Sequence, residues 1–394
     1  MALAIQTFLR SGKTLDDLRL PPYALVIQEG EDARVMFNYD QIDSDRTLVI
    51  TQEARGLILE RGTWDVVSLG FHRFFNFGEG PAAPVEFSKA YALEKVDGSY
   101  ISYYYYAGQW RASTRGSIRA SGQVGDFPFT FAELIARAQT PALVKGAGLS
   151  SEYTYIFELV SPYNKIVTPY EFVGLYLIGA RHRSSGSELP YSALQDLAKG
   201  LGVRIPAYHS FADSEAILKY LQTLRPVDEG VVVVQETTSP SGFSRVKIKN
   251  DRYVALHHVK SESGTKSLAL IIQKGEVDEV IQYFPEFESV LREGEKRWNA
   301  FFATLEERWS AGMAAVATIA DPKLRAKTFA LTIHPEQAGS DLLFQRLRSP
   351  NTTFATLAQS YKEDKIADLL RLTELKISAM EKLSATPTIP PEHV

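Results

Sequence analysis

The sequence predicts an α+β protein, in which a strand-rich region over residues 1–260 precedes an all-α region over residues 261–385. Up to about residue 260, short apolar and aromatic segments bounded by turn residues recur, which is typical of strands. Beyond that point apolar residues recur at helical spacing, beginning with an aromatic stripe at Trp298. The tail over residues 386–394 is rich in proline and is expected to be disordered.

Composition narrows the class of protein. The chain has 394 residues, of which 45% are hydrophobic and 23% charged, as in an ordinary soluble protein of two or three domains. The absence of cysteine excludes disulfides and cysteine catalysis and fits a cytoplasmic protein. No apolar run is long enough to cross a membrane and no secretory signal is evident, so no membrane partner is expected. With a net charge of −4, the chain could hold a nucleic acid only by a local basic patch.

The first elements expected are one helix and three strands, at residues 14–18, 23–28, 33–39 and 57–60. Arg55 and Gly56 stand immediately before the third strand. This pair is compatible with an exposed hairpin arginine, and equally with a planar guanidinium directed at phosphate. Aromatic residues then gather around Arg73, and most of these rings are expected to belong to the core.

The chain is expected to bend sharply where Lys95, Asp97 and Gly98 separate an apolar strand from an aromatic one. The glycine permits the bend and lets backbone approach a ligand closely. A lysine at such a bend becomes a nucleophile if its pKa falls well below about 10.4. Taken alone, however, this short motif is more typical of an exposed hairpin with a solvated lysine.

The second half of the strand-rich region contains further elements and two more charged features. The elements expected are helices at 129–138, 191–201 and 214–224 and strands at 153–160, 172–178, 231–234 and 245–249. Glu158 lies within an apolar strand, where it is either a strand-edge residue or a ligand contact. Lys247 and Lys249 alternate with apolar residues and therefore share one strand face, which is either solvated or a phosphate clamp.

Several segments, in the same order, resemble the covalent nucleotidyltransferases, which are the polynucleotide ligases and mRNA-capping enzymes. The similarity is greatest to the phage-type RNA ligase 1 family, which repairs cut tRNA. The segments are residues 54–60 (ARGLILE), 74–79 (FFNFGE), 94–99 (EKVDGS), 115–117 (RGS), 157–162 (FELVSP), 229–231 (EGV) and 246–253 (VKIKNDRY). The resemblance covers about residues 30–280, and so many ordered motifs outweigh the solvated-hairpin interpretation of Lys95.

The resemblance implies an ATP-dependent RNA ligase, with a nucleotidyltransferase (adenylation) domain built of antiparallel sheets over residues 1–260. Such an enzyme joins 5′-phosphate and 3′-hydroxyl RNA ends through a lysyl-AMP and an RNA-adenylate. By position, the resemblance implies catalytic roles for Lys95, Glu229 and Tyr253. It implies nucleotide contacts for Phe37, Arg55, Arg73, Glu158, Lys247 and Lys249, and a magnesium ligand in Asp278.

Three departures from the family pattern affect fine geometry. Phe37 stands where the family has a tyrosine near the nucleotide. Arg73 and Arg115 replace lysines, which keeps the charge but exchanges a point charge for a fork. The alignment of Asp278 requires a gap of one residue.

The resemblance also implies partners and a setting. ATP would be consumed, Mg²⁺ (or Mn²⁺) would assist, and the substrate would be RNA ends, either single-stranded or in a broken tRNA. We expect RNA repair in the cytoplasm, or in the cytoplasm of an infected host cell if the gene is viral. The sequence does not fix the oligomeric state, although a monomer is favoured.

Two other classes of protein remain as alternatives. A DNA ligase or capping enzyme would share the first domain but carry a small β-barrel after the lysine pair, where helices are expected here. A non-catalytic RNA-binding relative would have no use for Lys95 together with Lys247 and Lys249.

Overall fold

The computed structural model describes residues 2–164, 166–237, 242–254 and 264–375. The chain divides into two compact units, Met1–Tyr253 and Val254–Val394. The expected domain boundary at 260–261 and the expected tail at 386–394 lie outside the described residues.

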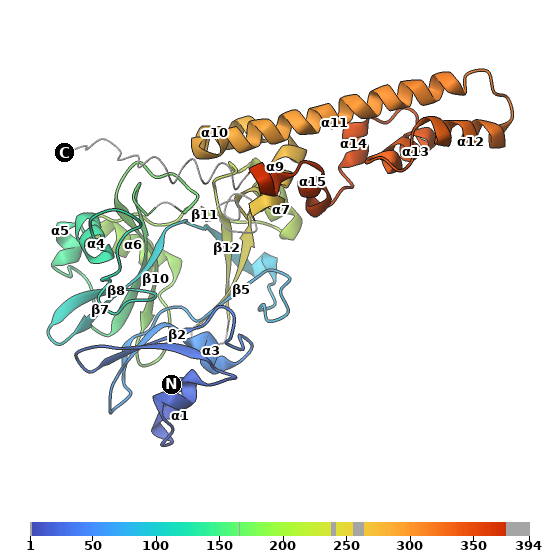
Figure 1. Ribbon diagram of the computed structural model, residues 1–394. Coiled ribbons are helices and arrows are strands. Elements are labelled where there is room, and N and C mark those ends of the chain that lie inside the picture. Colours follow the sequence, from blue (N-terminus) through green and yellow to red (C-terminus); the bar gives the residue numbers. More distant parts are fainter. Residues whose placement is uncertain (1, 165, 238–241, 255–263, 376–394) are drawn as a thin grey trace. The chain divides into compact units, whose positions relative to one another are not determined.

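The first sheet of the N-terminal unit is antiparallel and is packed against short helices (Figure 1). Its strands are β1 (Leu25–Glu29), β2 (Arg34–Tyr39), β3 (Arg55–Glu60) and β4 (Val66–Ser68), and its helices are α1 (Ala4–Arg10), α2 (Leu15–Arg19) and α3 (Val49–Glu53). Alternation along β2 places Phe37 and Tyr39 on the face that packs with Ile5 and Leu9 of α1. This packing anchors the strand whose end carries Tyr39.

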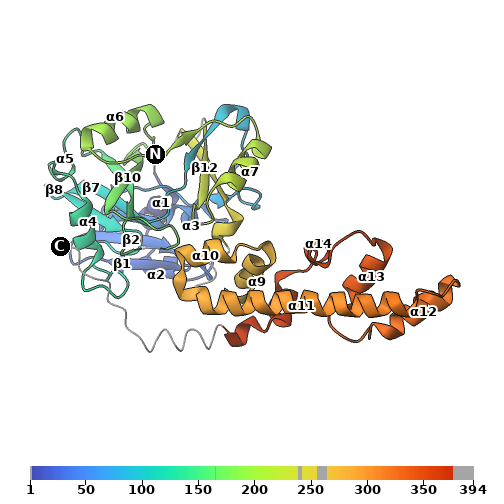
Figure 2. The same ribbon diagram turned by 90° about the horizontal axis from the view of Figure 1, so that it is seen from above.

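The second sheet has the order β10-β9-β7-β8 and is also antiparallel. Its strands are β7 (Ser99–Tyr106), β8 (Gln109–Thr114), β9 (Tyr153–Val160) and β10 (Gly174–His182). Helices α4 (Phe131–Ala138), α5 (Pro141–Val144) and α6 (Tyr191–Leu201) lie around it (Figure 2). Leu134, Leu143 and Leu201 from these helices share a core with Phe157 and Leu177 of the sheet, and the buried helices hold the sheet rigidly.

The third sheet has the order β11-β6-β12-β13-β5. Its strands are β5 (Phe75–Asn76), β6 (Ala90–Glu94), β11 (Tyr208–His209), β12 (Gly230–Glu236) and β13 (Phe243–Lys249). All neighbours are antiparallel except β5, which pairs with β13 in parallel. One face packs on α7 (Ser214–Thr223) through Val231, Val233 and Val246. The other face therefore carries Val232, Lys247 and their neighbours, and it is this face that forms the site.

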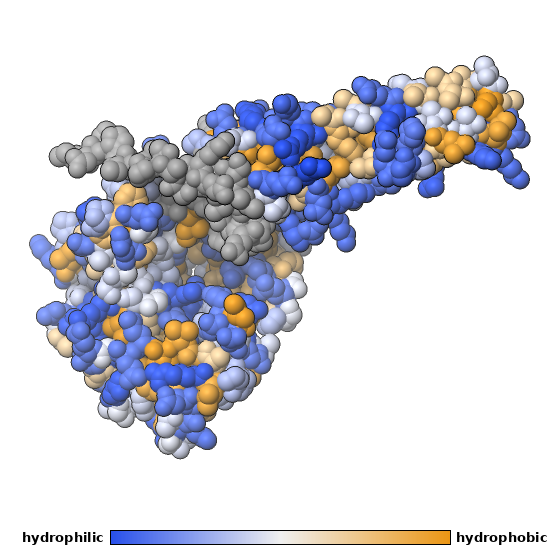
Figure 3. Space-filling model, viewed as in Figure 1, coloured by the Kyte–Doolittle hydropathy of each residue, from blue (hydrophilic) through white to orange (hydrophobic). Residues whose placement is uncertain are grey.

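The C-terminal unit is entirely helical over its described residues. Its helices are α9 (Gly264–Lys274), α10 (Val277–Tyr283), α11 (Glu288–Ala315), α12 (Pro322–Thr332), α13 (Ser340–Arg348), α14 (Phe354–Ala358) and α15 (Glu363–Leu369). The aromatic stripe of the sequence lies on α11, where Trp298 and Leu305 are buried. α12 packs along α11, and its Leu324 and Leu331 side chains are exposed. Hydrophobic surface is visible on this part of the unit (Figure 3).

The predicted fold class is confirmed, since strands with antiparallel pairing precede a helical region. Helices expected at 129–138, 191–201 and 214–224 correspond to α4, α6 and α7. The sequence pattern over residues 354–383 predicts one helical segment. The structure instead divides it into α14 and α15, and its end lies outside the described residues. Within the described ranges, none of the helices has the length and apolar character that a membrane span requires.

Candidate active site

Lys95 stands directly after β6, where the chain leaves the third sheet. Its backbone N–H donates to the carbonyl oxygen of Gly230 at 2.9 Å, so the start of β12 fixes its position. Gly98 lies close to the backbone of β9. A Cβ at this position would therefore lie only 2.4 Å from the carbonyl oxygen of Leu159. No other residue fits at Gly98 without moving backbone, and the bend predicted from the sequence is therefore enforced by packing.

A buried carboxylate lies between two lysines at this bend. Lys95 Nζ lies 2.5 Å from Glu229 Oε2, and Lys249 Nζ lies 2.9 Å from Glu229 Oε1. The side chain of Glu229 is only 6% exposed, whereas that of Lys95 is 21% exposed. The Glu229 carboxylate is therefore buried and paired within the protein, whereas the Lys95 side chain that it binds is still accessible to a ligand.

Lys247 lies two residues before Lys249 on the same face of β13. Burial, reinforced by the charges of Lys95, Arg55 and other cations, lowers the pKa of Lys247 to about 8. Its Nζ lies 5.4 Å from the centre of the Phe74 ring. A cation held in this way gains from a nearby anion more than a solvated lysine does.

Three arginines gather around Tyr39 at the end of β2. The guanidinium carbons of Arg73 and Arg115 lie 4.7 and 5.7 Å from the centre of its ring. Although burial acts to raise the pKa of Tyr39, the charges of Arg73, Arg115 and Arg55 lower it below its ordinary value. Over the described residues, buried Arg55 Nη1 and Arg73 Nε have no hydrogen-bond partner. Guanidinium groups left open in this way suit a phosphate.

Glu158 projects from β9 into the same pocket as Lys95. Burial raises the pKa of this carboxyl to about 7, against the opposing attraction of Lys95. The pocket holds about 80 Å³, and its apolar lining includes Leu93 and Val232 of the third sheet and Ile178 of the second. A planar apolar group with hydroxyls near Glu158 and phosphates near the cations would match this distribution.

Tyr253 and Asp97 form a buried support beneath the bend. Asp97 Oδ1 accepts the hydroxyl of Tyr253 at 2.8 Å, and Oδ2 accepts backbone N–H groups of Val167 and Thr168 at 3.0 and 2.8 Å. Asp97 is 5% exposed. The aspartate of the Lys-x-Asp-Gly motif thus ties the bend to two other segments, a role that spacing in the sequence did not reveal.

The structure brings together eight of the ten predicted site residues within the N-terminal unit. They are Lys95, Glu229, Tyr253, Arg55, Arg73, Glu158, Lys247 and Lys249. Phe37 is fully buried in the core beneath α1 and presents no surface to a ligand. Tyr39, on the same strand face, is the aromatic residue that the arginines surround. Its hydroxyl is the one feature in the sequence that distinguishes it from Phe37, because alternation places both residues on the same strand face.

Asp278 belongs to the C-terminal unit, in the first turn of α10, and its exposed carboxylate lies 2.6 Å from Arg292 Nη2. Over the described ranges, no three histidine, aspartate or glutamate side chains gather to hold a metal. Asp278 and Glu229 are both occupied by cationic side chains. The described residues thus do not form a metal site of their own.

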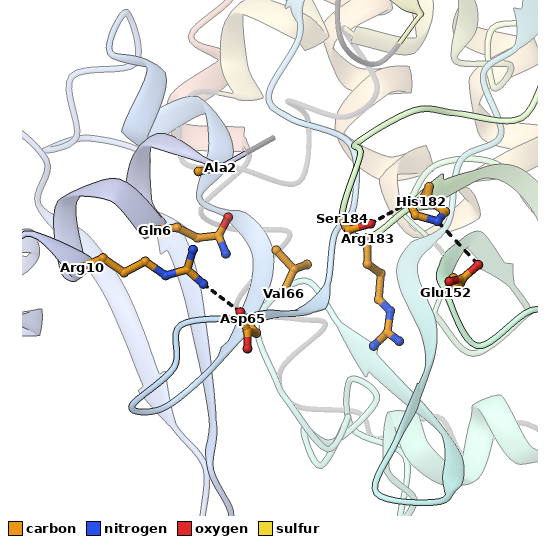
Figure 4. Close-up of a pocket in the computed structure, with 9 residues that line it drawn as sticks. All are labelled: Ala2, Gln6, Arg10, Asp65, Val66, Glu152, His182, Arg183 and Ser184. Atoms are coloured by element: carbon orange, nitrogen blue, oxygen red, sulfur yellow. Dashed lines mark hydrogen bonds and ion pairs between the residues drawn. The ribbon is translucent and has the colours of Figure 1, made fainter.

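A larger pocket, of about 510 Å³, lies between α1, the hairpin of β3 and β4, and the end of β10 (Figure 4). Four of its ionisable residues form two pairs. Arg10 contacts Asp65 at 2.8 Å, and His182 lies 3.7 Å from Glu152. Arg183 instead donates to the backbone carbonyl oxygens of Val67 and Tyr105, and its buried Nε has no partner among the described residues. This pocket thus holds one cation without a carboxylate, whereas several such cations gather around Lys95.

This chain is similar in sequence to proteins described as RNA ligases. A candidate bifunctional polynucleotide kinase/RNA ligase from Autographa californica nuclear polyhedrosis virus is 33% identical over 282 residues, covering 66% of this chain and 38% of that protein. An RNA ligase from Rhodothermus phage RM378 is 27% identical over 298 residues, covering 60% of this chain and 67% of that protein. The chain thus spans well under half the length of the first relative. Among solved structures, an archaeal ATP-dependent RNA ligase has 12% sequence identity and a TM-score of 0.46, covering 96% of this chain and 81% of that chain.

The family model described as RNA ligase matches residues 53–253. These residues hold Arg55, Lys95, Glu158, Glu229 and the Lys247–Lys249 face, so the matched region and the pocket coincide. The chain belongs to the RNA ligase family.

Proposed function

We propose that this protein is an ATP-dependent RNA ligase in which Lys95 carries AMP. The observation that supports this most strongly is the contrast of charge around Lys95. Its ammonium is held 2.5 Å from the buried Glu229 carboxylate, while Arg55, Arg73 and Lys247 nearby form no described ion pair with a carboxylate. Such a pocket holds the nucleophile in place and leaves its cations open to phosphates.

In the first step, neutral Lys95 Nζ would attack the α-phosphorus of ATP. A nitrogen–phosphorus bond forms, the bond to the bridging oxygen breaks, and pyrophosphate leaves. Glu229 is the nearest carboxylate that can accept the proton from Lys95. Lys247 and the arginines around Tyr39 would neutralise charge on the α-phosphate and the leaving pyrophosphate.

In the next steps, the AMP would pass to the 5′-phosphate of an RNA end, and a 3′-hydroxyl would then displace AMP to join the ends. Glu158 is proposed to bind the ribose hydroxyls, and Tyr253 to support the bend through Asp97. Mg²⁺ is expected to arrive with ATP, whose phosphates supply most of its ligands. Tyr39 is proposed in place of Phe37 as the aromatic residue near the phosphates. Sealing of broken RNA, as in repair, is the setting that such a reaction would serve.

The test is covalent labelling with ATP that carries a radioactive α-phosphate. Wild-type protein is expected to retain label through denaturation, and Lys95→Ala is expected to retain none while keeping its melting temperature. Lys89→Ala is the matched control, because Lys89 is an exposed lysine just before β6 that pairs with Glu86. Full labelling of Lys95→Ala would rule out the assignment.

A second assay separates RNA ligases from other nucleotidyltransferases. Labelled wild-type protein is offered 5′-phosphorylated RNA or DNA ends with a 3′-hydroxyl partner. We expect release of label and sealing with RNA. Labelling without any sealing of RNA would instead favour a DNA ligase or capping-like enzyme.

A further inference from the structure

A second cavity, of about 400 Å³, shares a wall with the Lys95 pocket. The residues that line both are Phe71, Phe74 and Arg245. Beyond this wall the lining combines aromatic and apolar side chains with polar and charged ones, although most of the exposed surface of the cavity is apolar. Its remaining lining residues include Val49, His72, Arg73, Phe75, Ala83, Phe243 and Ser244.

The shared wall is fixed by a buried ion pair. Arg245 Nη2 lies 2.6 Å from Glu188 Oε2, and the two side chains are 13% and 4% exposed. The guanidinium of Arg245 also lies over the Phe71 ring, 4.3 Å from its centre. With Arg245 held on two sides, the wall is preformed rather than adaptable.

Both carboxylates that line the cavity already have partners within the protein. Glu188 is held by Arg245, and Glu53 accepts the backbone N–H groups of Ala4 and Ile5 at 2.9 and 3.0 Å. Neither acid is therefore free to bind a cationic ligand. What the cavity offers a ligand must come from its other polar groups.

Four polar side-chain atoms of the cavity are buried and have no hydrogen-bond partner in the described part of the chain. Glu188 Oε2 is one of them, although it lies within ion-pair distance of Arg245. The other three, which have no ion-pair partner either, are His72 Nε2, Arg73 Nε and Ser244 Oγ. Burial and the nearby charge of Arg181 lower the pKa of His72 to about 3, so its ring is neutral near pH 7. Arg73 Nε can only donate, and the serine hydroxyl and imidazole can donate or accept. Unsatisfied groups of this kind call for a partner.

Aromatic walls with convergent donors match one chemical class, a heteroaromatic ring bearing carbonyl or ring-nitrogen acceptors. We propose that this cavity is a second nucleobase site, which holds the unstacked base of an RNA end. The proposal rests on the proposed function. Arg73 connects the two sites, because it lines the cavity and also lies against Tyr39 among the phosphate-binding cations. A base in the cavity would thus place its own phosphate beside that cluster.

The test combines a change in the protein with a change in the RNA. Each cavity variant and the wild-type protein are compared on intact RNA ends and on RNA ends that lack one base. Ala83→Phe fills the cavity, and His72→Phe removes the unpaired imidazole nitrogen while keeping a ring. Neither residue belongs to the proposed adenylation machinery. Pro84→Phe is the control, because it adds the same ring at an exposed neighbour outside the cavity. Pre-adenylated RNA is sealed to an acceptor, with either the 5′-terminal donor nucleotide or the 3′-terminal acceptor nucleotide made abasic.

We expect Ala83→Phe and His72→Phe each to lower kcat/KM for sealing intact ends at least tenfold, with Lys95 labelling by ATP unchanged. We also expect kcat/KM for sealing by the wild-type protein to fall by a similar factor when one of the two RNA ends is abasic. With that abasic end, Ala83→Phe should lower kcat/KM no further. The end that shows this non-additivity identifies the bound base. The proposal is wrong if both cavity variants seal RNA as well as Pro84→Phe does. It is also wrong if, with both of the abasic ends, the effects of the cavity variant and of the missing base on kcat/KM multiply. In both cases the cavity holds only water. Failure of wild-type protein to label or seal would instead contradict the proposed function.

Discussion

At the scale of single residues, the site is distinguished by how its charges are compensated. Glu229 is shared by two lysines, whereas Lys247 and the arginines around Tyr39 have no carboxylate of their own among the described ion pairs. Burying cations without partners costs stability. A bound polyphosphate would offset this cost, because its negative charges would pair with these cations.

The low pKa of Lys247 leads to a prediction about pH. Burial and neighbouring cations lower this pKa to about 8, so the ammonium is charged below that pH and loses its proton as the pH rises through it. ATP binding by the wild-type protein should therefore weaken between pH 7 and pH 9. Lys247→Arg should show a flatter profile, because a guanidinium stays protonated. Dissociation constants measured across this range check the prediction, and parallel profiles for the two proteins would contradict it.

Tyr39 and Phe37 lead to a paired prediction. Tyr39→Phe removes the hydroxyl among the arginines and should lower kcat/KM for adenylation about tenfold, as the loss of about 1–1.5 kcal/mol implies. Phe37→Leu should leave adenylation by folded protein unchanged and lower only the melting temperature, since Phe37 is a core residue. Labelling rates and thermal melts separate the two effects. Equal rates for wild type and Tyr39→Phe would remove Tyr39 from the site.

The sequence could place most of the site's residues but not choose between these two aromatics. Val35, Phe37 and Tyr39 share one strand face, so alternation alone treats them alike. Both side chains are buried, at 0% exposure for Phe37 and 7% for Tyr39, but only the Tyr39 ring has arginines beside it. The core on this face includes Ile5 and Leu9 of α1, which come from the start of the chain. Burial by a segment that lies far away in sequence is information that a local pattern does not contain.

At the scale of elements, helices were easier to predict than the sheet around Lys95. α4 carries its own start signal, because Thr130 and Glu133 form a reciprocal capping box. The partners of β6, by contrast, are β11 and β12, more than a hundred residues later in the chain. The contact between Lys95 and Glu229 spans 134 residues. Neither strand order nor this contact follows from periodicity.

The bend after β6 leads to a prediction about Gly98. A Cβ at this position would lie 2.4 Å from the carbonyl oxygen of Leu159 and 3.1 Å from Glu158 Cγ. Gly98→Ala should therefore push β7 from β9, displace Glu158 and Lys95, and reduce adenylation more than tenfold. Gly80→Ala is the control, since no atom lies within 4 Å of a Cβ there. Labelling and melting curves of both variants test this, and normal labelling of Gly98→Ala would show that the bend tolerates a side chain.

At the scale of the whole molecule, the two units differ in how their cationic side chains are paired. In the N-terminal unit, a group of cations that includes Lys95, Lys247 and Arg55 converges on one pocket. In the C-terminal unit, Arg346 binds both oxygens of Glu306 at 2.7 Å and lies over the rings of Trp309 and Phe354. Arg346 is thus a structural residue of the helical unit. Three other cations of this unit, Arg325, Lys327 and Arg348, are the ones that we propose for RNA contact.

The final prediction separates chemistry from RNA selection. Every residue of the Lys95 pocket lies within residues 1–253, so a protein truncated after residue 263 should still label Lys95 with AMP. If the helical unit selects RNA by shape, the truncated protein should seal unstructured ends but lose its preference for a broken structured RNA.

Within the full chain, joint replacement of Arg325 and Lys327 by alanine should reduce that preference without changing adenylation. Arg346→Ala should instead lower the melting temperature, because it leaves buried aromatic rings and Glu306 without their partner. Sealing rates on the two RNA substrates, compared for all four proteins, measure the preference. If the truncated protein keeps the full preference, selection lies in the N-terminal unit. If it is insoluble or does not label, the helices serve the stability of the fold and the selection role is wrong.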